Sequence, residues 1–114
     1  MLRIRFQYPT GSTLGYSLER LADGTFYDNS TSTFVAVPVT PIVPLPEDTG
    51  IYVGRYKVTL TATPIVQFHD GNYTVTIHDR ANSNHVVGEL GTRMFNGDDC
   101  MSYGLGNIGT IVRL

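Results

Sequence analysis

Apolar and polar residues alternate with a period of two along most of the chain, which is the pattern of half-buried β-strands. The clearest alternation runs through 72–79, where Tyr73, Val75 and Ile77 share one face. No window keeps apolar residues at the i, i+3, i+4 and i+7 spacing of an amphipathic helix over three turns. Further strands are predicted at 2–7, 13–20, 25–27, 33–37, 51–60 and 85–95, the last broken by Gly88 and Gly91. The pattern therefore predicts an all-β fold.

Proline and glycine indicate where these strands end or cross. The segment 38–46 carries four prolines, which cannot donate to a strand ladder, so we expect an edge strand or a segment that crosses between two sheets. Asp23 and Gly24 are typical of a hairpin turn. Gly54 falls inside the predicted strand at 51–60, where it indicates a bulge or a close approach of two backbones.

A short motif occurs twice and predicts two corners between sheets. The letters TPIV at 40–43 recur at 63–66, and each copy precedes an Asp, a Gly and a Tyr. In β-sandwiches a corner tyrosine keeps its ring in the core while its hydroxyl bonds to upstream backbone. Two such corners favour a Greek-key sandwich of seven to nine strands. The predicted corner residues are Asp48, Gly50 and Tyr52 in the first copy and Asp70, Gly71 and Tyr73 in the second.

These residues carry a resemblance to a known family. The first corner has the Asp-x-Gly-x-Tyr spacing of immunoglobulin-like (Ig-like) domains, and 70–79 resembles the Asp-Gly-x-Tyr-x-Val-x-Val strand of bacterial and bacteriophage Ig-like modules. The run 18–89 is similar to small β-sandwich domains among phage virion and tail structural proteins. The resemblance implies an Ig-like antiparallel Greek-key β-sandwich. Because the chain has no tryptophan and a single cysteine, the antibody-type disulfide with its packed indole is absent.

The C-terminal stretch is predicted to behave differently from the rest. We divide the chain into a sandwich at 1–95 and a C-terminal extended arm at 96–114, which glycines interrupt but which is more apolar than a free linker. Either the arm supplies the last strand of its own sheet, or it reaches a neighbouring subunit by strand addition. The predicted interface residues of the arm are Met101, Tyr103, Leu105, Ile108, Ile111, Val112 and Leu114.

Charge and composition exclude several classes of partner. The net charge of −2 and the single lysine, Lys57, provide no basic surface for phosphates, so we expect no nucleic-acid partner. No apolar run approaches the roughly 18 residues that span a bilayer, and the alternating start of the chain is not typical of a signal peptide. Cys100 follows two aspartates, which disfavour a thiolate nucleophile.

No residue pattern announces catalysis or metal binding. The histidines are His69, His78 and His85, and neighbouring strand residues such as 78 and 79 face opposite sides, whereas zinc needs three or four convergent ligands. We therefore expect hydrogen-bonded or exposed histidines, no metal, no cofactor and no enzymatic activity.

The functional expectation is a structural subunit of a phage virion, as a capsid decoration, neck, tail or baseplate component. Its partners would be other virion proteins and copies of itself, in a virion assembled in the host cytoplasm. A low charged fraction of 16% suits a protein buried in repeated interfaces. The alternative is a carbohydrate-binding or receptor-binding module that uses exposed tyrosines. Two or three coplanar tyrosines on one sheet face would favour that alternative, and inward-facing tyrosines would disfavour it.

Overall fold

The chain forms an all-β structure. A computed structural model describes residues 2–48, 50, 52–60, 70–95, 98–104 and 109–110, with backbone only for 95, 98–104 and 109–110. The strands are β1 (Leu2–Gln7), β2 (Leu14–Arg20), β3 (Thr25–Asp28), β4 (Thr33–Val35), β5 (Val43–Leu45), β6 (Arg55–Leu60), β7 (Gly71–Asp79), β8 (His85–Phe95), β9 (Asp98–Gly104) and β10 (Gly109–Thr110). The only helical element in these ranges is a 3-10 turn, η1 (Arg80–Asn82). Across the same ranges, no helix is long and apolar enough to cross a membrane.

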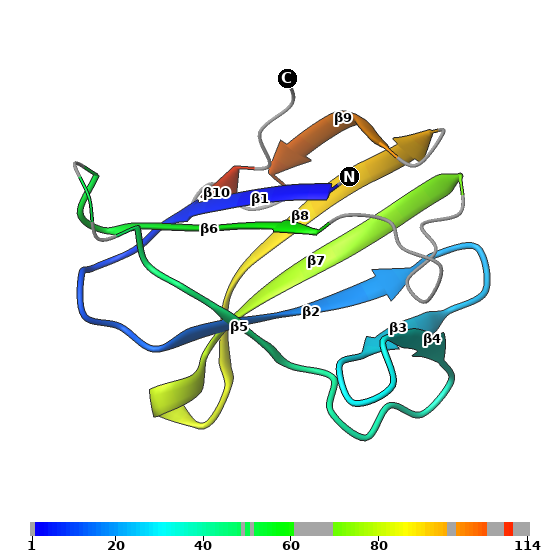
Figure 1. Cartoon of the computed structure of the whole chain (residues 1–114), viewed down its shortest axis with the longest axis horizontal. Coiled ribbons are helices and arrows are strands. Elements are labelled where there is room, and N and C mark those ends of the chain that lie inside the picture. Colours follow the sequence, from blue (N-terminus) through cyan, green and yellow to red (C-terminus); the bar gives the residue numbers. More distant parts are fainter. Residues whose placement is uncertain are drawn as a thin grey trace.

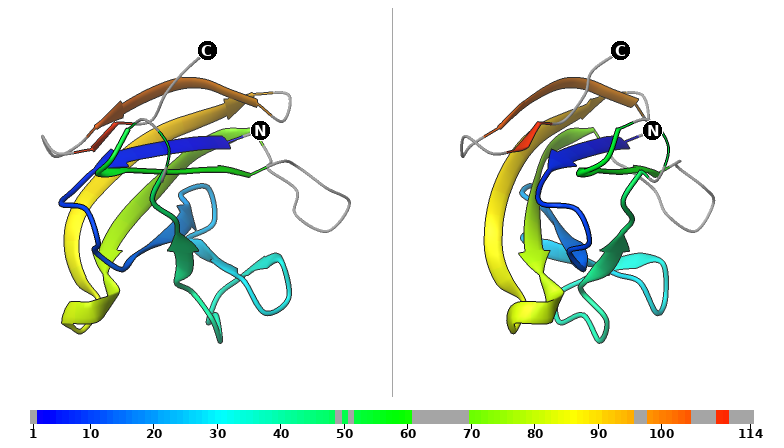
Figure 2. Two further views of the ribbon diagram at one scale, coloured as in Figure 1. Left: turned by 60° about the vertical axis from the view of Figure 1, so that its left-hand side comes forward. Right: turned by 90° about the vertical axis from the view of Figure 1, so that its left-hand side faces the viewer.

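Two antiparallel sheets form the sandwich. The smaller sheet has the strand order β10-β1-β6, and the larger has the order β4-β3-β2-β7-β8-β9, with β5 also paired to β2 (Figure 1). The long strands β7 and β8 curve, and the smaller sheet lies inside that curve (Figure 2). The core therefore lies between the two sheets. The Greek-key connectivity and the Ig-like relationship stay predictions.

The predicted alternation is confirmed at the core. Tyr73, Val75 and Ile77 of β7 are fully buried, and Leu2, Ile4 and Phe6 of β1 face them from the smaller sheet. Residues two apart on a strand point to the same side, so β1 and β7 contribute every second side chain to this core. The other core residues are Leu14, Tyr16, Leu18, Tyr27, Leu45, Tyr56, Leu90 and Met94.

The glycines of β8 do not break the strand, so that expectation was wrong. Ile77 lies opposite Gly88 while His78 lies opposite Val86, which leaves Val87 as an extra, bulged residue. A bulge absorbs the irregularity by bending the strand locally, and pairing resumes on either side of it. The prediction for 33–37 was two residues too long, because β4 ends at Val35.

The proline-rich segment lies at an edge of β2, as predicted. Its residues 43–45 pair with 14–16 of β2. Gly15 makes this close crossing possible: a Cβ at that position would lie 2.6 Å from Ile42 Cγ2 and 2.8 Å from Arg80 Cδ. A side chain at residue 15 would therefore push the crossing segment off the sheet.

The described part of the C-terminal stretch pairs with its own chain. β9 is antiparallel to β8, and β10 pairs with β1 through Arg5 opposite Thr110 and Phe6 opposite Gly109. The arm was predicted to pair either with its own sheet or with a neighbouring subunit, and the described residues of the arm pair with their own chain. Three predictions fall on residues that the structure does not describe. They are the second TPIV copy at 63–66, His69, and the start of the arm directly after residue 95.

Candidate functional site

Tyr56 forms the corner that the sequence predicts for Tyr52. Its ring is buried in the core, and its hydroxyl donates to the carbonyl of Pro9 at 2.8 Å and accepts from the Ser12 amide at 3.0 Å. Ring burial combined with a hydroxyl bound to upstream backbone is the arrangement of a tyrosine corner. This corner joins β6 to the 8–12 loop between β1 and β2.

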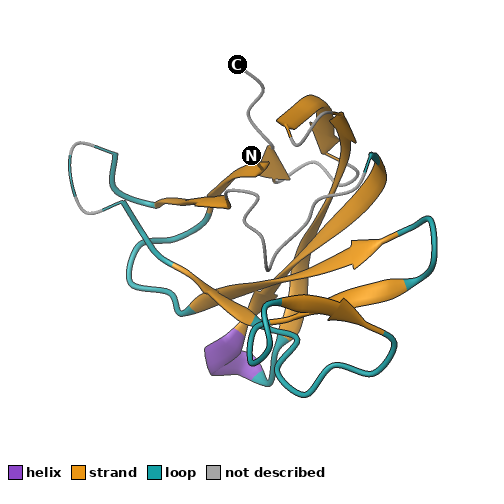
Figure 3. Ribbon diagram, turned by 45° about the vertical axis from the view of Figure 1, so that its right-hand side comes forward, coloured by secondary structure: helices purple, strands orange, loops and turns teal. Residues whose placement is uncertain are grey.

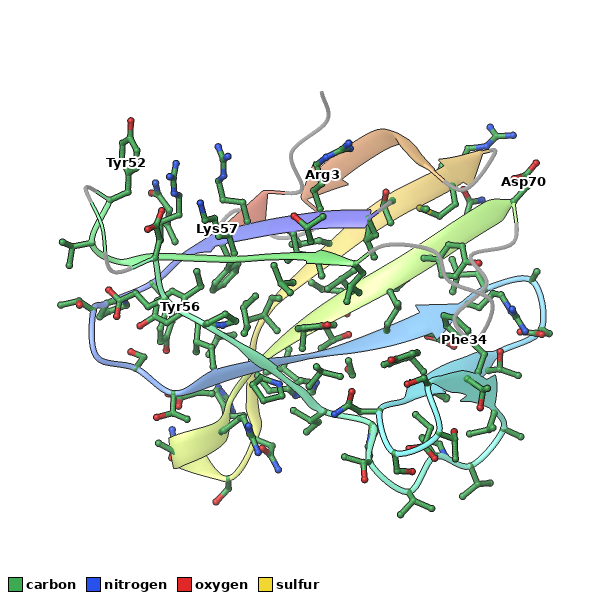
Figure 4. The ribbon with its side chains drawn as sticks, viewed as in Figure 1. Arg3, Phe34, Tyr52, Tyr56, Lys57 and Asp70 are labelled. Atoms are coloured by element: carbon green, nitrogen blue, oxygen red, sulfur yellow. The ribbon has the colours of Figure 1, made fainter. Side chains whose placement is uncertain are left out.

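Tyr52 lies outside the core, so its predicted role was wrong. The strand begins at Arg55 rather than at 51, because a turn precedes it in which the Arg55 amide donates to the Tyr52 carbonyl at 3.3 Å. Alternation along β6 therefore does not extend back to Tyr52. Its side chain is 55% exposed and that of Val53 is 68% exposed. Figure 4 shows the Tyr52 ring pointing away from the body.

One face of the Tyr52 ring is covered by a cation. The Arg55 guanidinium lies 3.8 Å from the ring centroid, which is a cation–π contact. Arg55 also bonds to Asp48 at 3.0 Å, so the cation is held from two sides. The exposed ring is thereby fixed in orientation. We call residues 52–54 with Arg55 the Tyr52 loop.

Glu47 anchors the Tyr52 loop to the 8–12 loop. Its carboxylate accepts from the Gly54 amide at 2.7 Å, and on the other side from the Thr10 hydroxyl at 2.6 Å and the Gly11 amide at 3.1 Å. These bonds, the Thr10 hydroxyl foremost, lower the pKa of Glu47 below its usual value. A carboxylate that accepts several hydrogen bonds ties two loops together that are more than thirty residues apart in sequence.

Asp48 and Gly50 belong to the turn that leads into this loop. Asp48 Oδ1 accepts from the Gly50 amide at 3.1 Å, while Oδ2 lies 3.0 Å from Arg55 and 3.4 Å from Lys57. The Arg55 contact is the largest cause that lowers the pKa of Asp48 to about 2. Asp48 and Gly50 were predicted to form a corner around a buried Tyr52, whereas in the structure they lead into a loop in which Tyr52 is exposed.

A second exposed apolar loop lies between β4 and β5. Val37 is 85% exposed and Val39 is 82% exposed. The base of this loop is held by Asp28, which is only 2% exposed and accepts from the amides of Val39 at 3.0 Å and Thr40 at 3.1 Å. Asp28 also accepts from the hydroxyl and amide of Ser30 at 2.7 and 2.9 Å. We call residues 36–40 the Val37 loop.

The hydrogen bonds to Asp28 change its acidity. The Ser30 hydroxyl is the largest contributor, followed by the Val39 amide, and together with the other bonds they lower the pKa of Asp28 from 3.8 to about 2. The ionised carboxylate is therefore the form that holds the Val37 loop in place.

The two loops lie at opposite ends of the molecule. In Figure 1 the connection before β6 is at the upper left, and the connection from β4 to β5 is at the lower right. Figure 3 shows the same separation from another direction. The described part of the protein therefore presents two exposed apolar loops at opposite ends, each held by a hydrogen-bonded carboxylate.

The second predicted corner keeps its ring in the core. Tyr73 is buried, and its ring lies 5.8 Å from that of Phe34. Asp70 is exposed in the bend before β7, which Gly71 begins. The bond from the Tyr73 hydroxyl to upstream backbone stays a prediction.

The side chains of the predicted arm residues are not among those that the structure describes. Met101 and Tyr103 lie in β9, whose backbone alone is described. The remaining arm residues, Leu105, Ile108, Ile111, Val112 and Leu114, lie outside the described ranges.

The histidines that the structure describes do not converge on a metal site. His78 Nε2 lies 2.8 Å from Ser17 Oγ, and its Nδ1 lies 3.1 Å from the Asn84 carbonyl oxygen. His85 is the cross-strand neighbour of Asp79. Among the described residues, no three His, Cys, Asp or Glu side chains lie close enough together to hold a metal ion.

The tyrosines do not form a flat sugar-binding surface in the described part of the chain. Tyr16, Tyr27, Tyr56 and Tyr73 are buried, and Tyr52 alone among the tyrosines whose side chains are described is mostly exposed. The criterion of two or three coplanar exposed rings is therefore not met there.

Sequence reasoning missed both anchoring carboxylates for different reasons. Asp28 had a local signal, because Asp-x-Ser is the spacing at which an aspartate bonds the backbone two residues on. Glu47 had none, because its partners Thr10 and Gly11 are 37 and 36 residues away.

Comparison with protein-family models gave no match, and neither did comparison with curated proteins or with solved structures. A functional assignment therefore rests on the geometry of the two loops and on the sequence resemblance.

Proposed function

We propose that this protein is a non-enzymatic structural subunit of a phage virion, and that it binds neighbouring copies of itself through the Tyr52 loop and the Val37 loop. The virion role comes from the resemblance of 18–89 to phage structural β-sandwich domains. The contact surfaces come from the loops. Since β9 and β10 pair within the chain, the loops replace the arm as the contact surfaces in this proposal.

The observation that supports the proposal is the rigid presentation of apolar side chains. Val37, Val39, Tyr52 and Val53 are exposed, yet the backbone beneath each pair is fixed by bonds to Asp28 or Glu47. A loop that is already ordered loses less conformational entropy on association, so more of the free energy of burying its apolar side chains remains as binding affinity. Exposed apolar side chains of this kind supply the surface that a contact between subunits would bury.

The placement of the loops favours head-to-tail assembly of several subunits rather than a closed dimer. Two different patches at opposite ends allow one subunit to contact two neighbours in a head-to-tail manner. Heterologous contacts of this type generate rings if the rotation closes and filaments if it does not.

The test is sedimentation velocity of the full chain over a range of concentrations. We expect species larger than the monomer that increase with concentration. The double variants Tyr52→Ser/Val53→Ser and Val37→Ser/Val39→Ser should each abolish them. Val86→Ser, an exposed valine in neither loop, is the matched control and should behave as the unmodified protein. A monomer at every concentration, or association that survives both double variants, contradicts the proposal.

A further inference from the structure

A pocket lies beside the middle of β2, between the part of β2 that pairs with β5 and the part that pairs with β3. Residues 14–16 of β2 pair with β5, and residues 19–20 pair with β3, so Ser17 falls between the two partners. An open pocket of about 320 Å³ lies there, on the face of the larger sheet opposite the buried side chains of Tyr16 and Ile77. Its apolar wall is formed by Phe26, Ala36, Val37, Pro38, Pro41 and Ile42, and its polar residues are Ser17 and His78. Small-molecule sites start near this volume, at about 300 Å³.

Hydrogen bonding defines what the polar pair offers to a ligand. The Asn84 carbonyl can only accept, so Nδ1 of His78 carries the hydrogen that bonds to it at 3.1 Å. In the neutral ring Nε2 is then an acceptor, and the Ser17 hydroxyl donates to it at 2.8 Å. The hydrogen of Ser17 is thereby used within the protein. Among the described residues no group donates to the Ser17 oxygen, so its lone pairs offer one hydrogen-bond acceptor in a lining that is otherwise almost entirely apolar.

We propose that this pocket is a binding site for an aromatic ring that carries a hydroxyl group. The ring packs against the side chains of Phe26, Pro38 and Pro41, which are the cyclic apolar groups of the wall. The hydroxyl of the ligand donates to Ser17 Oγ. An apolar ligand without a donor leaves that acceptor unsatisfied, which disfavours its binding.

The pocket does not depend on the proposed virion role, because only its wall and the Ser17–His78 pair are needed to bind the ring. The phenolic group has two sources, a free small molecule or a tyrosine side chain presented by a polypeptide. Both use the same ring and the same donor, and the experiment distinguishes them by the size of the probe.

The experiment is an NMR titration of the full-length protein with four probes. We expect p-cresol to give saturable shifts at Ser17, Ile42 and His78, with an affinity about fivefold higher than that of 4-methylanisole or toluene, which lack the donor. N-acetyl-tyrosinamide is the fourth probe. Its binding at the same residues indicates a tyrosine on a polypeptide, whereas binding of p-cresol alone indicates a free phenol. Equal affinities for p-cresol and 4-methylanisole, or no saturable shifts at these residues, overturn the proposal.

A pair of substitutions on one loop tests the location. Ala36→Trp places a large ring at the pocket wall and should reduce p-cresol binding at least tenfold. Val39→Trp adds the same ring to the same loop outside the pocket, and should leave binding unchanged. Retained p-cresol binding in a folded Ala36→Trp variant contradicts the site. If that variant fails to fold, the comparison of p-cresol with 4-methylanisole on the unmodified protein still decides.

Discussion

Tyr8 and Gly54 approach each other so closely that a side chain at residue 54 would press against the Tyr8 backbone. The Tyr8 amide donates to the Gly54 carbonyl at 2.9 Å, and a Cβ at residue 54 would lie 3.0 Å from the Tyr8 carbonyl oxygen. Gly54 also has a φ of +83°, which side-chain-bearing residues rarely adopt. The sequence predicted a bulge or a close backbone approach at this glycine, and the close approach is confirmed.

Gly54→Ala should lower the free energy of unfolding by about 2 kcal/mol, because the methyl group adds a backbone contact to an unfavourable φ. Gly11 is the matched control, with a φ of +81° and open space around its Cβ position. Gly11→Ala should therefore cost only about 1 kcal/mol, from conformation alone. Urea denaturation measures both. Equal losses would show that the contact with Tyr8 does not matter.

Tyr56→Phe should destabilise the protein by about 2 kcal/mol, because the Ser12 amide and the Pro9 carbonyl lose their shared partner. Tyr52→Phe should change stability by less than about 0.5 kcal/mol, as expected for an exposed position. The two substitutions remove the same atom from two tyrosines four residues apart, one in β6 and one in the loop before it. Thermal or urea unfolding in which Tyr52→Phe has the larger effect would contradict the assignment of the corner to Tyr56.

Tyr16→Phe should stabilise the protein by about 1 kcal/mol. The Tyr16 hydroxyl is buried and has no hydrogen-bond partner among the described residues. Burial raises the pKa of this phenol, with a smaller contribution from Tyr27. Removing an unsatisfied buried hydroxyl recovers its desolvation cost without leaving a partner unpaired. A clear loss of stability in urea denaturation would show that the hydroxyl has a partner after all.

The acid stability of the protein should depend on Asp28. Its pKa is about 2 in the folded chain and 3.8 without these contacts, so folding favours the ionised form. The stabilisation is fully present above about pH 4 and is lost as the pH falls through 2. Asp28→Asn should therefore lower the urea midpoint at neutral pH and show a shallower decline between pH 4 and pH 2. Parallel declines in the two proteins would contradict this role.

The alternation of apolar and polar residues predicted correctly those strands that are extended over their whole predicted range. β1 and β7 were predicted almost to the residue, because two-residue periodicity holds wherever the backbone stays extended. Tyr52 was assigned wrongly because the turn at 53–54 interrupts that periodicity, and a pattern of residue types does not show where a turn ends.

The candidate site was less predictable than the fold because long-range bonds build it. Glu47 meets Thr10 only after β1 and β6 pair, and Ser17 meets His78 only after β2 and β7 pair. Neither contact leaves a signal in local sequence, since any exposed glutamate or serine would look the same before folding.

Strand β2 pairs with different strands along its length, and the parts of the larger sheet on either side of it are held to it by different numbers of residue pairs. The β3–β4 hairpin joins β2 through two residue pairs, Glu19 with Phe26 and Arg20 with Thr25, whereas β7 joins it through seven. Native proteins open first where the fewest backbone bonds must break. Amide hydrogens of the hairpin should therefore exchange with solvent before those of β7, so one wall of the Ser17 pocket belongs to the part of the protein that opens most easily.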